Sequence, residues 1–328
     1  MSGKRYHNRD AVLGYNATNN LIVFERSGGK SFSYKDLCVQ DFLNKGRQFS
    51  YIRREIGELE ESLEDWGGDI QKNFKEEIRV KGDKIYVDGR LAGHGLSLKR
   101  AYRYKSKTLP KVFNNLFDEF VVDAGARYLT DEPNRLMSIV KSVARDREFK
   151  LYMIGNKVSS ITPYNLEWDL PPFDTTMHIK QYDTLIYLGD KDIRGQGADE
   201  PKTAFDRCFG HTRYARFANE NEVIDGDEQA FVLKRPPNSR HKFNLVVGKA
   251  VIGCYYDTIE GRIFFDSHTD LTHPIKINFD IYHLADAQLL YNPNTHYAKS
   301  IKSLLGMGAV YYSDKKVKLI MRDVLRRL

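Results

Sequence analysis

Residues Asn20–Lys35 read NLIVFERSGGKSFSYK, in which an apolar run ends in a glycine turn followed by Lys30 and Ser31. A phosphate-binding loop has the pattern G-x-x-x-x-G-K-[ST], because glycines let backbone N–H groups turn toward phosphates while the hydroxyl binds Mg²⁺. The first glycine of the pattern is replaced by Phe24, and the acidic Glu25 follows it. The stretch matches the second half of such a loop, but similar glycine turns also occur in ordinary surface loops.

The composition is that of a globular protein with an anionic partner. A chain of 328 residues is long enough for two domains, and 41% hydrophobic with 29% charged residues does not predict disorder. Lys and Arg number 51 against 44 Asp and Glu, which gives a net charge of +7 and a pI near 9.0. Nucleic acid is the first expectation for the partner, and a membrane surface the second.

Cysteine usage and apolar runs indicate the compartment. Cys38, Cys208 and Cys254 are far apart and have neither C-x-x-C nor zinc-site spacing, so we expect reduced thiols in a cytosol. The amino terminus, MSGKRYHNRD, lacks the apolar core of a signal peptide, and no apolar run approaches the ~20 residues that span a bilayer. The sequence predicts a protein that is neither secreted nor embedded in a membrane.

Strands alternate with helices over the first 190 residues, which predicts a mostly parallel α/β sheet. An antiparallel meander is expected over residues 76–98, with turns at 82–83 and 88–89. The expected strands are residues 21–24, 47–54, 111–120, 149–156 and 182–189, and the expected helices are 32–43, 55–66 and 132–148.

A change in composition after Asp190 divides the chain. We expect a first domain over residues 1–195, a linker over 196–228 that is rich in glycine and charge, and a second domain over 229–328. The second domain alternates like three antiparallel strands, with turns at Pro236-Pro237 and Glu260-Gly261, and ends in a basic helix.

Asp118 and Glu119 end the apolar strand in LFDEF, residues 116–120. In P-loop NTPases of the additional-strand type, the first acid orients Mg²⁺ and the second polarises the attacking water. The alternative is a polar strand end that caps the next helix, but the strand, loop and helix upstream favour catalysis. The predicted ATP and Mg²⁺ site then contains Arg26, Ser27, Gly28, Gly29, Lys30, Ser31 and Asp118, with Ser31 and Asp118 on the metal and Lys30 on the solvent side of the loop.

Three more polar residues follow neighbouring strands. Arg53 and Arg54 are expected at the same sheet edge as Glu119, where an arginine could restrain the carboxylate until DNA arrives. A solvated surface pair is the alternative. Asn156 is expected either to sense the γ-phosphate or to lie in an ordinary turn.

Arg145 and Arg147 close the helix over residues 132–148. Cations at this position complement the helix macrodipole without any further role. The functional alternative is an arginine finger for the nucleotide of a neighbouring subunit, which requires a ring.

The motifs, taken in order, resemble the DNA encapsidation ATPases of small phi-29-type tailed phages. The resemblance extends over nearly the whole chain. It implies a RecA-like, additional-strand P-loop ATPase domain and a small α+β RNase H-like domain that is a vestigial nuclease. The runs that carry it are VKGDKIYVDGRLAGHGLSL (80–98), NNLFDEF (114–120), SVARDRE (142–148) and GNKVSSITPY (155–164).

The resemblance also implies a function. Members of this family form a homomeric ring, usually a pentamer, on the portal vertex of an empty prohead in the host cytoplasm. The ring is a motor that hydrolyses ATP to move double-stranded DNA inward, in some cases with a packaging RNA.

The same resemblance implies residue roles. Lys30 and Ser31 would bind phosphate and Mg²⁺, Asp118 would orient the metal, and Glu119 would be the catalytic carboxylate. Arg147 would be the trans-acting finger, Arg53 would restrain the glutamate, and Lys105 and Arg145 would be further basic interface residues. Phe24 and Ser27 depart from the loop pattern and bear on the geometry of the loop.

Asp257, Asp266 and Asp270 are the candidate nuclease acids of the second domain. Two-metal nucleases need clustered acids, whereas acids on antiparallel strands are typical of turns, so we expect no nuclease activity. Two other functions remain open at this point: a nucleic-acid-binding structural module with an inactive nucleotide site, and a helicase or small-molecule kinase on the same core.

Overall fold

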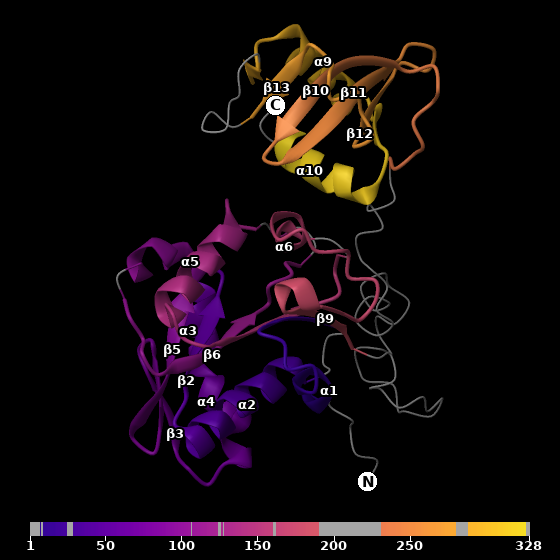
Figure 1. Cartoon of the computed structure of the whole chain (residues 1–328). Coiled ribbons are helices and arrows are strands. Elements are labelled where there is room, and N and C mark those ends of the chain that lie inside the picture. The colour runs from indigo at the N-terminus through magenta and orange to yellow at the C-terminus, as the bar shows by residue number, and fades with distance from the viewer. Residues whose placement is uncertain are drawn as a thin grey trace, which may run out of the picture. The chain divides into compact units, whose positions relative to one another are not determined.

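The computed structural model describes residues 7, 9–24, 29–105, 107–123, 126, 128–159, 162–189, 231–279 and 288–325. The chain divides into two compact units, Met1–Ile224 and Asp225–Leu328 (Figure 1). The predicted linker over 196–228 lies outside the described residues, so the predicted domain boundaries stay a prediction. Within the described parts of the chain, no helix is long and apolar enough to cross a membrane.

The first unit contains a nine-stranded, mostly parallel sheet, as predicted. Its order is β3-β4-β5-β2-β6-β7-β1-β9-β8, and antiparallel pairs occur only between β3, β4 and β5 and between β8 and β9. The strand β7 lies between β1 and β6, which is the additional-strand arrangement. The strands are β1 (Asn19–Phe24), β2 (Gln48–Arg53), β3 (Ile78–Lys81), β4 (Lys84–Val87), β5 (Arg90–Ser97), β6 (Val112–Asp118), β7 (Lys150–Asn156), β8 (Met177–Ile179) and β9 (Thr184–Leu188).

Helices cover both faces of this sheet, because successive strand residues point to opposite faces. Tyr51 of β2 packs in one core with α2 and α4, whereas Ile52 packs in the other with α5 and α6 (Figure 1). The predicted helix over 55–66 is divided at Asp65 into α3 and α4. The helices are α1 (Arg9–Leu13), α2 (Lys30–Lys45), α3 (Ile56–Glu64), α4 (Trp66–Ile70), α5 (Glu132–Ala144) and α6 (Pro163–Glu167), with 3-10 turns η1 (Gln71–Asn73), η2 (Leu98–Tyr104) and η3 (Lys180–Tyr182).

The second unit contains a six-stranded sheet in the order β14-β13-β10-β11-β12-β15. The central strands β10, β11 and β12 form the predicted antiparallel meander, and β13 and β15 add in parallel on either side. This order fits the RNase H-like domain that the resemblance implies. The elements are β10 (Arg240–Val247), β11 (Ala250–Asp257), β12 (Arg262–Asp266), β13 (Lys276–Asn278), β14 (Leu289–Leu290), α9 (His296–Gly306), β15 (Val310–Tyr312) and the basic helix α10 (Lys315–Leu325).

The turn predicted at Pro236-Pro237 is present, because the Ser239 N–H donates to the Pro236 carbonyl at 3.1 Å. It does not join two strands of the meander, since residues 231–234 before it form only a single bridge, from Val232 to Tyr312. The first turn of the meander, between β10 and β11, contains Gly248 at a φ of 56° that favours glycine. The predicted turn at Gly261 is confirmed, with a φ of 64°.

The cysteines agree with the expectation of reduced thiols where the structure describes them. Cys38 and Cys254 are free and buried, and burial raises the pKa of both thiols. Cys208 lies outside the described residues.

Candidate nucleotide site

The carboxyl ends of four neighbouring parallel strands gather the predicted site residues. Arg53 ends β2, Asp118 ends β6 and Asn156 ends β7, while Lys30 begins the helix that follows β1. The strands are in register, so that Phe24 pairs with Asn156. Parallel strands present their carboxyl ends at one edge of the sheet, where α/β proteins bind ligands. Of the predicted loop residues, Arg26, Ser27 and Gly28 lie outside the described part of the chain.

Lys30 is buried rather than on the solvent side of the loop, which corrects the prediction. Gly29, at a φ of 73°, leads into α2, and only 8% of Lys30 is exposed. The Lys30 ammonium donates hydrogen bonds to Asn156 Oδ1 at 2.9 Å and to the Phe24 carbonyl at 3.2 Å. Packing against the strand ends therefore fixes this cation where the loop would hold phosphate.

Phe24 fits the loop because its side chain points into the core. Phe24 is 2% exposed and lies among the buried residues beneath α2. The Lys30 ammonium lies over its ring, 4.5 Å from the ring centroid. Gly189 makes room for it, since a Cβ at that position would collide with the Phe24 ring. Phe24 can thus replace the glycine of the motif because Gly189, on a neighbouring chain segment, has no side chain. The sequence pattern alone did not reveal this pairing of Phe24 with Gly189.

Ser31 and Tyr51 both donate hydrogen bonds to the Asp118 carboxylate. Ser31 Oγ donates to Asp118 Oδ1 at 3.1 Å, and the Tyr51 hydroxyl donates to Asp118 Oδ2 at 3.2 Å. Burial and the Asp118 carboxylate raise the pKa of Tyr51, which keeps it a neutral donor. Hydroxyl and carboxylate oxygens are what Mg²⁺ prefers, so Ser31 and Asp118 fit the predicted metal role. Tyr51 is a positioning residue that sequence analysis missed.

Arg53 contacts the predicted catalytic carboxylate. Its Nη2 donates to Glu119 Oε2 at 2.7 Å, and its Nη1 lies 3.8 Å from Asp118 Oδ2. The Glu119 side chain is 56% exposed, whereas Arg53 is 8% exposed. The surface-pair alternative is therefore wrong, while the restraining role of Arg53 stays a prediction.

Arg54 is also buried, on the opposite side of the strand end. It forms a two-point ion pair with Glu132 at 2.7 and 2.9 Å. Its remaining N–H groups reach the main-chain carbonyls of Glu119 and Phe120 at 3.1 and 3.0 Å. Sequence analysis missed Glu132, which lies 78 residues away from Arg54.

Arg147 lies at the opposite edge of the sheet. It donates to the carbonyls of Ala144 at 3.1 Å and Leu109 at 3.2 Å, and also to those of Val143 and Pro110. Leu109 and Pro110 precede β6, and Asp118 is the last of the seven residues of this strand. At ~3.3 Å per residue, the strand places Asp118 roughly 20 Å away from Leu109 and Pro110. Arg147 therefore lies away from the candidate site of its own chain. Arg145 and Lys105 are exposed, at the ends of α5 and η2.

Comparison with known proteins agrees with this architecture. The model of the podovirus DNA encapsidation protein (Gp16) family matches residues 1–328. The chain belongs to this family. Viral DNA packaging is therefore its function, as the motifs predicted.

Individual relatives of this encapsidation protein cover its full length. It is 26% identical to the DNA packaging protein of Bacillus phage phi29, over 100% of this chain and 99% of the relative. The solved phi29 viral genome packaging motor assembly superposes with a TM-score of 0.77 at 26% identity, over 98% of this chain and 99% of the other. The N-terminal domain of the phi29 DNA packaging ATPase gives 0.54 at 29% identity, over 58% of this chain and 99% of that domain.

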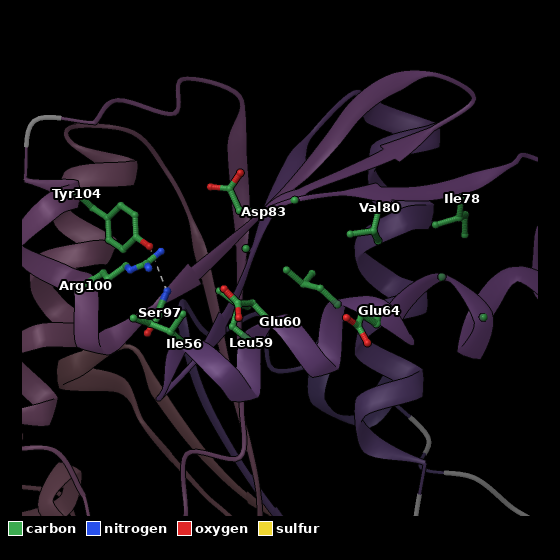
Figure 2. A pocket seen from close by; sticks show the side chains of 15 residues that line it. Ile56, Leu59, Glu60, Glu64, Ile78, Val80, Asp83, Ser97, Arg100 and Tyr104 are labelled. Atoms are coloured by element: carbon green, nitrogen blue, oxygen red, sulfur yellow. Dashed lines mark hydrogen bonds between the residues drawn. The ribbon is translucent and has the colours of Figure 1, made fainter.

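A groove of about 850 Å³ lies beside the nucleotide site of this encapsidation protein, between α3, α4, β3 and β5 (Figure 2). Leu59 and Val80 line it together with the carboxylates Glu60 and Glu64. Ser97, the strand partner of Arg53, also lines it and donates its main-chain N–H to the Tyr104 hydroxyl at 3.3 Å. None of the predicted site residues lines this groove.

The candidate nuclease acids do not form one site. Asp257 accepts main-chain N–H groups of its own turn, Asp266 pairs with Arg235 at 2.8 Å, and Asp270 accepts from Thr272. Among the residues that the structure describes, no three His, Cys, Asp or Glu side chains are grouped to hold a metal ion. The absence of nuclease activity in this encapsidation protein stays a prediction.

Proposed function

We propose that the chain is the ATPase of a viral DNA-packaging motor, which couples ATP hydrolysis to translocation of double-stranded DNA into an empty prohead. The observation that carries the proposal is the arrangement at the carboxyl strand ends. Lys30, Ser31 and Asp118 meet there, next to a Glu119 carboxylate bonded to Arg53.

Each residue has a distinct task in hydrolysis. Lys30 binds the β- and γ-phosphates, and Ser31 and Asp118 hold Mg²⁺. The bound Mg²⁺ neutralises charge that develops on the phosphates. Glu119 accepts a hydrogen bond from the attacking water and orients it, and Asn156 reports on the γ-phosphate.

Arg53 makes hydrolysis conditional. While its guanidinium holds Glu119 at 2.7 Å, the charge-assisted bond occupies the carboxylate that has to polarise water. Release of Glu119 is then the step that DNA binding controls, which prevents hydrolysis without translocation.

The position of Arg147 supports a ring. This arginine lies at the sheet edge opposite its own phosphate site, and it serves the nucleotide of the next subunit in a ring, usually a pentamer. Exposed Lys105 and Arg145 contribute positive charge to that interface. The similarity to the phi29 motor assembly supports docking on the portal vertex of a prohead in the host cytoplasm. In some members of the family a packaging RNA takes part in this docking.

The second domain, residues 229–328, then acts without metal-dependent cleavage, as a vestigial nuclease domain. The alternative of a structural module with an inactive nucleotide site rested on Phe24. That argument is weakened because the Phe24 side chain lies in the core.

ATP turnover by the purified protein, with and without double-stranded DNA, tests the proposal. DNA-stimulated hydrolysis that Glu119→Gln removes is the expected result. Absence of hydrolysis under both conditions would overturn it in favour of the structural module. Packaging reconstituted with empty proheads then tests translocation directly.

A further inference from the structure

Two adjacent arginines leave the end of β2 on opposite sides. Arg53 lies on the nucleotide side and holds the Glu119 side chain, whereas Arg54 lies on the side of α5 and α6. Alternation along a strand dictates this arrangement. The two guanidinium groups therefore hold different parts of one residue: Arg53 the carboxylate, and Arg54 the main-chain carbonyl.

Arg54 is held by a fully buried carboxylate. Glu132, the first residue of α5, is 0% exposed and accepts four hydrogen bonds. Two come from Arg54, one from the Tyr164 hydroxyl at 2.7 Å and one from the Leu129 N–H at 2.8 Å. A carboxylate with its acceptors occupied in this way fixes the guanidinium in one orientation.

The segment that Arg54 holds has an unusual backbone. Glu119 has a φ of 61°, in the left-handed region that non-glycine residues seldom adopt. Such conformations persist only where surrounding contacts impose them, and they concentrate at functional sites. The bonds from Arg54 to the carbonyls of Glu119 and Phe120 are contacts of this kind.

We propose that Arg54, held by Glu132, is a positioning residue that fixes the main chain of Glu119 while its carboxylate moves between Arg53 and the attacking water. The inference rests on the proposed function. It assigns the two arginines separate tasks, since Arg53 has to release Glu119 during each cycle and Arg54 does not. Loss of Arg54 then misplaces the carboxylate without touching Lys30, Ser31 or Asp118.

Arg54→Lys and Glu132→Gln test this division of tasks in the full-length protein. Lysine keeps the charge but lacks the planar fork that reaches Glu132 and two carbonyls together. We expect kcat for ATP to fall about 10- to 100-fold, because small displacements of a catalytic group have effects of this size. The Kd for a non-hydrolysable Mg²⁺–ATP analogue should stay within about twofold of the parent, since kcat alone depends on the placement of Glu119.

Arg79→Lys is the matched control, since Arg79 pairs with Glu77 at 2.6 Å on the surface and both side chains are exposed. Thermal melting identifies variants that fail to fold. In that case Tyr164→Phe, which removes one hydrogen bond to Glu132, is measured in the same way and should lower kcat at unchanged Kd.

The outcomes separate this inference from the proposed function. No hydrolysis by the parent would refute the proposed function, and with it the basis of the inference. An active parent with an inactive Glu119→Gln variant upholds that function. Parental kcat in the folded variants would then overturn the role of Arg54, and so would parallel losses of kcat and nucleotide affinity.

Discussion

Arg53 Nη2 lies 2.7 Å from Oε2 of Glu119, although the two residues are 66 positions apart in the sequence. Replacing Arg53 by Gln keeps most of the side-chain length and removes the charge that restrains the carboxylate. We expect faster hydrolysis without DNA and a smaller stimulation by DNA, in a steady-state ATPase assay. An unchanged ratio of stimulated to basal rates would contradict the restraining role, and Arg79→Gln serves as the surface control.

Lys30→Ala should remove hydrolysis and also lower stability slightly. Loss of a charge-stabilising donor of this kind costs roughly 100-fold or more in rate. Because Lys30 is buried and bonded to Asn156 and Phe24, we also expect a loss of about 1 kcal/mol in the free energy of unfolding. Hydrolysis and urea denaturation measure the two effects. Hydrolysis at the parent rate would rule out the phosphate loop.

Arg147 should act in trans. An arginine finger is worth ~10³-fold or more in rate, so Arg147→Ala alone should be nearly inactive. Glu119→Gln should bind Mg²⁺–ATP normally and hydrolyse it slowly, yet still offer its own Arg147. Mixing the two inactive proteins should restore DNA-stimulated hydrolysis at interfaces where an intact Glu119 meets an intact Arg147. If mixed rings form and remain inactive at every ratio, Arg147 only closes its helix.

Gly189→Ala should destabilise the first unit, because its Cβ would collide with the Phe24 ring. Overpacking of this kind typically costs about 1–3 kcal/mol, which chemical denaturation can measure. Gly57→Ala is the control, since no atom lies within 4 Å of its added Cβ and alanine favours helix α3. Equal stability of the two alanine variants would show that the close approach is unimportant.

His7 should make stability depend on pH. Burial, with the nearby Lys30 and Arg9 cations, lowers the pKa of His7 from 6.5 to about 4 in the folded protein. The unfolded chain therefore takes up this proton first, so stability is lost as pH falls from 6.5 to 4, on the order of 1–3 kcal/mol. His7→Phe keeps a ring beside Phe24 and should show a shallower loss over this window. Parallel pH profiles would exclude His7 as the cause.

Sequence patterns alone predicted the parallel sheet and most residues of the candidate site. Apolar runs, glycine turns and helical spacing are short-range signals, and they located the strands that end at Phe24, Asp118 and Asn156. Lys30, Ser31, Asp118 and Glu119 could be named because each directly follows or ends such an element. Parallel strands then bring their carboxyl ends to one edge without further information.

The burial of polar groups and the partners that hold them are visible only in the folded chain. Arg54 contacts Glu132 across 78 residues of sequence, and Gly189 contacts Phe24 across 165. Such pairs leave no periodic trace, because the two partners lie on different elements that are far apart in the sequence. A charged side chain such as Arg54 can be buried only where another group compensates its lost hydration, and here that group, Glu132, is distant in sequence. The burial of Arg54, and with it the role proposed for this residue, is therefore visible only in the folded chain.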